Sequence, residues 1–356
     1  MKTVKEHHLD ILTDYVRQLY RKPDLRQLFL ELTLRCNEHC FHCGSNCLPD
    51  GQPDELCLDE YRRILDEVSG DFDVKKVFLC ITGGEPLLRR DFFEILGYAA
   101  GLGFHWGMTS NGTLITKETA HRLADCGMKT ISVSIDGLPE THDRLRGFPG
   151  GYDAAMSGIQ NLIDEKAFRH VQVTTVVNHE TIGELDALFE IMNGIDIDSW
   201  RVINLEPIGR ALRWPNRMLT AEDYKTLFRF IREKREAGYP VQYGCSHYLG
   251  PELEGELRDW YWLCNAGIYT VSIMSNGDIG ACLDIERRPE TIQGNIRESR
   301  LKDVWENRFE LFRKDLAAES DYCRGCRHAD HCRGDARHSW NYDRNTPMIC
   351  FKGVLF

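Results

Sequence analysis

The chain has 356 residues and a net charge of -11 at pH 7, with 42% hydrophobic and 28% charged residues. This composition is ordinary for a soluble globular protein of about two domains and excludes a disordered or collagen-like chain. Nucleic acid is not an expected partner, because the acidic surface repels phosphate backbones. A membrane is not expected either, because no apolar run approaches the ~18 to 20 residues of a membrane helix.

The chain contains 14 cysteines, an unusual number for its length. The N-terminus shows no apolar core like that of a signal peptide, so we expect the protein to stay in the cytoplasm. Thiols are kept reduced in that compartment, and many thiols in a reducing compartment indicate metal ligands rather than disulfides.

A cysteine-rich loop follows the first predicted strand. Residues 1–27 form an N-terminal extension, and the apolar run 28–34 predicts a strand. Cys36, Cys40 and Cys43 come directly after it with the spacing C-x3-C-x2-C. Three thiolates on one short loop can bind three irons of a [4Fe–4S] cluster and leave the fourth iron open to another ligand. A structural zinc site with a distant fourth ligand is the alternative.

Repeated strand and helix patterns continue from the first strand to about residue 235. Further strands are predicted at 76–82, 104–109, 130–135, 171–177 and 200–205, and helices at 91–100, 117–126, 154–164 and 183–192. Repeated strand–helix units imply a parallel sheet with right-handed crossovers. Six such units predict an α/β fold, a partial (β/α)6 TIM-like barrel, over residues 28–235.

Polar and turn-forming residues stand directly after these strands. The set comprises Gly83-Gly84-Glu85-Pro86, Asn111, Ser134, Asp136, Asn178 and Glu206. In parallel barrels the carboxyl ends of the strands build the active site. Gly, Asn, Asp and Pro are also the usual turn formers, so each residue alone could belong to an ordinary turn. Together, and beside a three-cysteine loop, they indicate the rim of an active site.

The pattern changes after about residue 235. The runs 268–274 and 279–282 flank an Asn-Gly turn signal at Asn276-Gly277, which predicts a hairpin. Strand–helix units become fewer and cysteines more frequent. We therefore expect a small, cysteine-rich α+β domain over residues 236–356.

The residues of the first cysteine loop and of the second strand end resemble the radical S-adenosylmethionine (SAM) superfamily. The resemblance covers residues 28 to about 235 and rests on C-x3-C-x2-C and Gly-Gly-Glu-Pro. It implies that Cys36, Cys40 and Cys43 bind a [4Fe–4S] cluster whose fourth iron is chelated by SAM. It further implies reductive cleavage of SAM to a 5′-deoxyadenosyl radical, hydrogen abstraction from a substrate, and an electron donor of the flavodoxin or ferredoxin type.

The same resemblance implies a set of SAM-binding residues. His42 would lie near the adenine, the Gly-Gly-Glu-Pro stretch would meet the methionyl amine, and Arg146 would pair with the methionyl carboxylate. Ser134 and Asp136 would bond to the ribose or the methionyl group. For Arg146 the alternative is a solvated role. Asn111 and Asn178 match the family only weakly, and helix capping or a turn role is the alternative for both. The implied set is His42, Gly83, Gly84, Glu85, Pro86, Ser134, Asp136 and Arg146.

The last cysteines resemble the SPASM extension, a C-terminal domain that carries auxiliary iron–sulfur clusters. In the full pattern one auxiliary [4Fe–4S] cluster takes the positions of Cys323, Cys326, Cys332 and Cys350, and all four are present. The resemblance therefore implies at least one auxiliary cluster. A structural zinc site is the alternative for these four thiols.

The SPASM pattern is incomplete at one position. Ala336 stands where a further cysteine is expected, and that cysteine belongs to a second auxiliary cluster that would also use Cys264 and Cys282. Cys245 could supply a third ligand, although its spacing does not match the pattern well. Metal ligation by Cys264 and Cys282 therefore stays open beside a role as buried thiols.

Radical SAM enzymes with this extension mostly modify peptides or proteins, so we expect maturation of a ribosomally made peptide. About 27 residues precede the first strand, too few for a leader-binding domain, so a separate recognition protein would be needed. The alternatives are oxidation or decarboxylation of a tetrapyrrole, sugar or cofactor precursor, anaerobic sulfatase maturation, and a non-catalytic iron–sulfur electron carrier. Candidate proton acceptors are Glu206, Asp143 and Tyr152, each with an equally plausible structural role.

Overall fold

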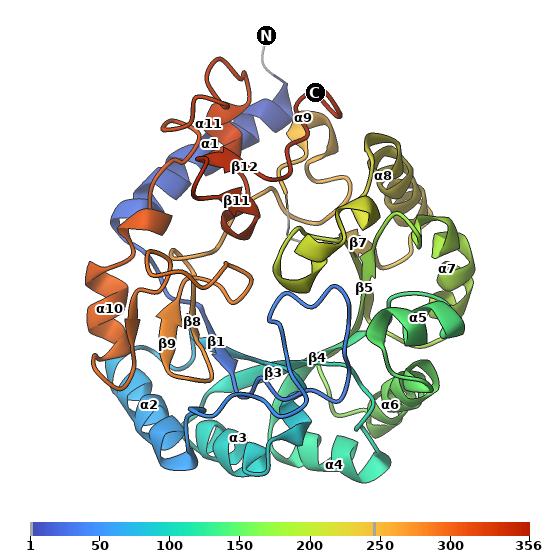
Figure 1. The fold of residues 1–356 in the computed structure, drawn as a ribbon, viewed down its shortest axis with the longest axis vertical. Helices are drawn as coiled ribbons and strands as arrows, with labels where there is room; N and C mark the ends of the chain where they lie inside the picture. The colour runs from blue at the N-terminus through green and yellow to red at the C-terminus, as the bar shows by residue number, and fades with distance from the viewer. Residues whose placement is uncertain (1–2, 245–246) are drawn as a thin grey trace.

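The computed structural model describes residues 3–244 and 247–356, and it places a strongly curved sheet inside a ring of helices (Figure 1). Seven strands pair in parallel in the order of the chain. They are β1 (Gln27–Glu31), β2 (Phe78–Thr82), β3 (His105–Ser110), β4 (Met128–Ser134), β5 (His170–Val177), β6 (Ser199–Asn204) and β7 (Val241–Tyr243). The expected α/β fold with a partial barrel is thereby confirmed.

Helices connect these strands and cover the outer face of the sheet (Figure 1). They are α2 (Leu58–Asp71), α3 (Phe92–Gly101), α4 (Lys117–Asp125), α5 (Pro139–Arg146), α6 (Gly151–Glu165), α7 (Leu185–Asn193) and α8 (Ala221–Glu236). The predicted strands and helices lie within a few residues of these bounds. The apolar periodicity of the sequence did not predict α2, α5, α8 or β7.

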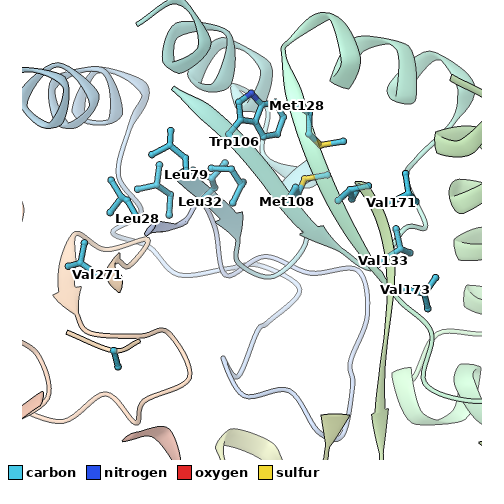
Figure 2. Packing of buried hydrophobic residues seen from close by; sticks show 14 of the residues in the cluster. Leu28, Leu32, Leu79, Trp106, Met108, Met128, Val133, Val171, Val173 and Val271 are labelled. Carbon is cyan, nitrogen blue, oxygen red and sulfur yellow. The ribbon is translucent and has the colours of Figure 1, made fainter. Parts of the chain in front are cut away.

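The main hydrophobic core lies between the sheet and the helices. Leu28, Leu79, Trp106 and Val133 come from four neighbouring strands and are each 0% exposed (Figure 2). Burying one such side chain contributes roughly 1.5–3 kcal/mol. Alternate residues of a strand face the other side of the sheet, which explains why the barrel interior is polar. There, for example, the hydroxyls of Ser132 and Thr174 lie 2.6 Å apart.

The C-terminal part of the chain adds strands to the free edge of β1. The predicted hairpin forms from β8 (Thr270–Ile273) and β9 (Asp278–Gly280), and β10 (Gly294–Asn295) pairs with β9. β8 itself pairs in parallel with β1, so the barrel sheet continues into these strands. The division of the chain at residues 235 and 236 stays a prediction.

The N-terminal extension forms the helix α1 (Val4–Arg21), which is capped by Thr3 and Glu6. α1 packs against the C-terminal part of the chain, beside α9 (Gly250–Leu253) and α11 (Ala329–Cys332) (Figure 1). The remaining α-helix and strands of the described residues are α10 (Leu301–Asn307), β11 (Trp340–Asn341) and β12 (Thr346–Pro347). In the described residues no helix has the length and the apolar character needed to span a membrane.

Candidate active site

The three cysteines of the first loop lie over the carboxyl end of the barrel, on the long loop between β1 and α2 that crosses the centre of the ring (Figure 1). Cys36 and Cys40 are buried and Cys43 is half-buried. Cys36 and Cys43 pack in one small cluster with Leu34 and with Cys47, whose thiol donates to the Gly83 carbonyl over 3.6 Å. The structure therefore gathers sulfur atoms at the rim that the sequence predicts.

The Gly83-Gly84 pair fastens the cysteine loop to the end of β2. The Gly84 amide donates to the Thr33 carbonyl over 2.8 Å, and the Glu85 amide donates to the Arg35 carbonyl over 2.8 Å. A Cβ atom on Gly83 would lie 2.3 Å from the Thr33 carbonyl oxygen, and one on Gly84 would lie 2.1 Å from that of Arg35. Only glycine permits so close an approach of the two backbones.

Glu85 is fully buried beside the end of β3. Its carboxylate accepts hydrogen bonds from the Ser110 hydroxyl at 3.0 Å and from the Asn111 amide at 2.9 Å. Burial raises the pKa of Glu85 to about 7, although these hydrogen bonds act in the opposite direction. Pro86 is buried at the start of the short helix that follows. The Gly-Gly-Glu-Pro stretch is thus a rigid part of the rim.

Arg146 joins the cysteine loop to the end of β4 through two buried carboxylates. Its guanidinium donates to Asp136 over 2.6 and 2.8 Å and to Glu38 over 2.9 Å. His42 lies 3.1 Å from the same Asp136 carboxylate. Burial raises the pKa of Asp136, but the charges of Arg146 and His42 outweigh it and hold this pKa well below its usual range. Ser134 is half-buried at the end of β4.

These contacts bear on the implied SAM-binding roles. Both Asp136 oxygens have protein partners, since Oδ1 accepts from the Val176 amide at 2.9 Å and Oδ2 from Arg146. Two buried polar atoms beside the cysteines, Glu38 Oε1 and His42 Nδ1, have no hydrogen-bond partner among the described residues. A loop with three thiols and unpaired polar atoms fits a cluster with an additional polar ligand. The SAM-binding roles of His42, Ser134, Asp136 and Arg146 stay predictions.

The segment after β6, which the sequence places at the same rim as the cysteine loop, contacts that loop directly. Arg210 is 8% exposed, and its Nε and Nη1 atoms donate to the carbonyls of Cys40 and Cys47, each over 2.7 Å. Its backbone amide donates to the Cys43 carbonyl over 3.0 Å. The pKa of Cys43 is lowered by the neighbouring Cys47 residue and further by the Arg210 charge.

The four terminal cysteines line one small cavity. Cys323, Cys326, Cys332 and Cys350 share its wall with His328 and Asp335, among others. Within the part of the chain that the structure describes, no three His, Cys, Asp or Glu side chains could hold a single metal ion. A [4Fe–4S] cluster needs a wider arrangement because each cysteine binds a different iron. The shared cavity fits such a donor set.

The second group of C-terminal cysteines does not line this cavity. Cys264 packs at the margin of an apolar cluster that contains Ala336 at 0% exposure. The Cys282 thiol lies 3.9 Å from an Asp284 carboxylate oxygen. Cys245 lies outside the described residues. Ligation of a second cluster by Cys264 and Cys282 stays open.

The three candidate proton acceptors differ in their surroundings. Asp143 caps the start of α6 by accepting from the amides of Gly150 and Tyr152. Tyr152 is buried with its ring against His142. The Glu206 side chain is 10% exposed, its Oε1 atom contacts His247 Nε2 at 2.8 Å, and its Oε2 atom lies 3.8 Å from His338 Nε2.

Two family models match the chain. The model of the radical SAM superfamily matches residues 30–192, and that of SPASM, an iron–sulfur cluster-binding domain, matches residues 264–327. An AdoMet-dependent heme synthase of Methanosarcina barkeri is 30% identical over 327 residues, which cover 87% of this chain and 90% of that protein. Mycofactocin maturase MftC of Mycolicibacterium smegmatis is 31% identical over 310 residues, 85% of this chain and 76% of that protein.

Solved structures show the same fold. Native anSMEcpe with bound AdoMet superposes with a TM-score of 0.74 at 19% identity, over 93% of this chain and 94% of that chain. SuiB of Streptococcus suis bound to S-adenosylmethionine has a TM-score of 0.70 at 20% identity, over 94% of this chain and 79% of that chain.

Proposed function

Because the chain belongs to the radical SAM superfamily and carries a SPASM domain, we propose that Cys36, Cys40 and Cys43 bind its SAM-binding [4Fe–4S] cluster. The protein is an enzyme with SAM and iron–sulfur clusters as cofactors. The observation that carries the assignment is the close packing of the cysteine loop on Gly83 and Gly84 at the barrel rim. We assign the auxiliary [4Fe–4S] cluster to the four cysteines that line the C-terminal cavity.

When bound, the cluster supplies the electron that cleaves SAM and yields a 5′-deoxyadenosyl radical, which removes hydrogen from the substrate. The protein itself orients the cysteine loop and shields it from water. Glu38, Asp136 and Arg146 fix the cysteine loop relative to β4 through buried ion pairs. The buried loop keeps Cys36 and Cys40 away from water. Glu206, which contacts His247 and His338 at the end of β6, is our candidate for accepting a proton from the oxidised substrate.

The substrate we favour is a carboxylated tetrapyrrole. Leu212 and Trp214 are 55% and 43% exposed on the segment after β6. The Arg217 guanidinium stacks over both the Trp214 ring and the ring of Phe41 in the cysteine loop, at 5.1 and 4.4 Å. Apolar and aromatic surface beside exposed Arg213 suits a planar, anionic molecule. The similarity to heme synthases supports the same class.

A ribosomally made peptide, the substrate expected from the sequence, is the second candidate. The 31% identity to a mycofactocin maturase supports it. With a peptide substrate, a separate recognition protein would present it to the enzyme. For either substrate we propose a cytoplasmic location and an electron donor of the flavodoxin or ferredoxin type.

The test uses anaerobically reconstituted protein with dithionite. We expect the wild type to convert SAM to 5′-deoxyadenosine, and Cys36→Ala, Cys40→Ala and Cys43→Ala to abolish the product. Cys57→Ser is the matched control, because Cys57 is an exposed thiol at the start of α2. Absence of 5′-deoxyadenosine from the wild type would contradict the proposal.

The substrate is tested by the fate of its hydrogen. Deuterated iron–coproporphyrin and a deuterated precursor peptide encoded beside the gene are offered separately. Deuterium in 5′-deoxyadenosine from the porphyrin supports the favoured class. Deuterium from the peptide alone supports the second candidate and overturns the first.

A further inference from the structure

Arg210 reaches three points of the cysteine loop from a different part of the chain. It lies in the short helix η3 (Gly209–Arg213), after β6. The side chain bridges the carbonyls of Cys40 and Cys47, and the backbone amide bonds to that of Cys43. These contacts join residues 163 and 170 positions apart in the sequence. One residue thus binds both sides of the loop turn that carries the third cysteine.

The neighbouring glycine makes this approach possible. Gly209 has a φ of 53°, and a Cβ atom there would lie 2.4 Å from the carbonyl oxygens of both Cys43 and Gly44. On the other side of the contact, a Cβ on Gly44 would lie 3.0 Å from Ile208 Cδ1. The two backbones therefore touch, and the Arg210 guanidinium is placed directly beside the loop.

The charge of Arg210 differs from that of the other buried arginine beside this loop. Arg146 forms ion pairs with Asp136 and Glu38, so carboxylates offset its charge. The hydrogen-bond acceptors of the Arg210 side chain are neutral carbonyl groups. A buried charge that faces neutral groups acts over a longer distance because the protein interior screens it weakly.

A positive charge next to an iron–sulfur cluster stabilises the reduced form, since reduction makes the cluster more negative. We propose that Arg210 is a positioning residue of the SAM-binding cluster, which keeps the cysteine loop closed and raises the reduction potential of the cluster. The inference rests on the proposed function only in taking the loop as the cluster site. A higher potential would ease the entry of the electron that SAM cleavage needs.

Two substitutions separate the charge from the hydrogen-bond geometry. Arg210→Gln removes the charge, and Arg210→Lys keeps it but cannot reproduce the planar fork that bridges two carbonyls. Arg232→Gln is the matched control, because Arg232 is an exposed arginine of α8. All three are reconstituted anaerobically as full-length protein.

The first measurement is a redox titration followed by electron paramagnetic resonance. The SAM-binding cluster is recognised by the signal that changes when SAM is added. The second measurement is the rate at which a chelator removes iron from this cluster. We expect a more negative potential for Arg210→Gln only, and a several-fold faster loss of iron for both Arg210 variants. Arg232→Gln should match the wild type in both.

Each outcome decides the proposal. An unchanged potential in Arg210→Gln overturns the role of the charge, and so does an equal shift in Arg210→Lys. Wild-type rates of iron loss in both Arg210 variants overturn the role in loop closure. If Arg210→Gln binds no cluster, Arg210→Lys alone tests the proposal. A wild-type potential together with faster iron loss in Arg210→Lys then supports it, and any other result overturns it. Failure of the proposed function is distinguishable, because the wild type would then show no cluster signal that responds to SAM.

Discussion

Leu9 of the N-terminal helix and Ala336 lie in one buried cluster, at 2% and 0% exposure, together with Tyr248 and Trp262. Ala336 occupies the position at which the SPASM pattern has a further cysteine, and Cys264 packs at the margin of the same cluster. Apolar side chains therefore border the Cys264 thiol on one side, as they border that of Cys332. Ala336 itself supplies no ligand for a second auxiliary cluster.

From this packing we predict about eight irons per chain, four for each of two [4Fe–4S] clusters. Iron and sulfide analysis of the anaerobically reconstituted protein measures this number. In Ala336→Cys we expect the same value, because Leu9 and Trp262 still pack in the cluster around this position. About twelve irons in the wild type would contradict the prediction, and about four would mean that the C-terminal cavity binds no cluster.

The buried pair of Arg146 and Asp136 provides a prediction about stability. Asp136→Asn keeps the shape of the side chain but leaves the guanidinium with one carboxylate, Glu38. Breaking a buried ion pair in this way costs about 3–5 kcal/mol. We expect urea denaturation to show a decrease of that size in the free energy of unfolding. The matched control is Asp14→Asn, which breaks an exposed pair with Arg17 and should cost at most about 1 kcal/mol. Equal losses in the two variants would refute the argument.

The sequence predicted the barrel well because its strands are short apolar runs with polar residues at their carboxyl ends. Runs such as 171–177 and 200–205 correspond to β5 (His170–Val177) and β6 (Ser199–Asn204). The first strand ends earlier than expected, at Glu31, because the chain beyond it bonds to the Gly83–Glu85 turn. The helix α1 was missed, although its capping pair of Thr3 and Glu6 is visible in the sequence.

Long-range pairings of charged residues could not be predicted from local pattern. Arg146 and Glu38 are separated by 108 positions, and Arg210 and Cys40 by 170. No local sequence pattern connects residues so far apart, so only the topology of the barrel brings these groups together. The same holds for β8, whose parallel pairing with β1 joins distant parts of the chain. Cysteine spacing, by contrast, is local, and the grouping of the terminal four thiols around one cavity agrees with it.

Glu85 should make stability depend on pH. Burial raises its pKa from an ordinary value of 4.5 to about 7, so between these values the folded protein binds more protons than the unfolded chain. The stabilising contribution of Glu85 to the free energy of unfolding is therefore fully present below its pKa in the unfolded chain. It is lost as the pH rises through its pKa in the folded protein. We expect Glu85→Gln to gain stability relative to the wild type between about pH 5 and about pH 8, by on the order of 3 kcal/mol.

The measurement for Glu85 is urea denaturation of the cluster-loaded enzyme without SAM, at several pH values. The difference between Glu85→Gln and wild type isolates this group from the other titrations. Glu94→Gln, on the surface of α3, is the control and should show no such trend. A constant difference between Glu85→Gln and wild type across the range would mean that Glu85 titrates outside it.

Gly84 should be indispensable for the cysteine loop. An alanine Cβ there would lie 2.1 Å from the Arg35 carbonyl oxygen and 3.0 Å from Cys36 Cβ, so the loop that carries the first cysteine must move. We expect Gly84→Ala to keep the circular dichroism of a folded barrel, to bind about four irons instead of about eight, and to form no 5′-deoxyadenosine from SAM. Gly70→Ala is the control, because nothing lies within 4 Å of its added Cβ, and it should be up to about 1 kcal/mol more stable in α2. Full iron content and SAM cleavage in Gly84→Ala would show that the loop tolerates displacement, and the rim would then not depend on this contact.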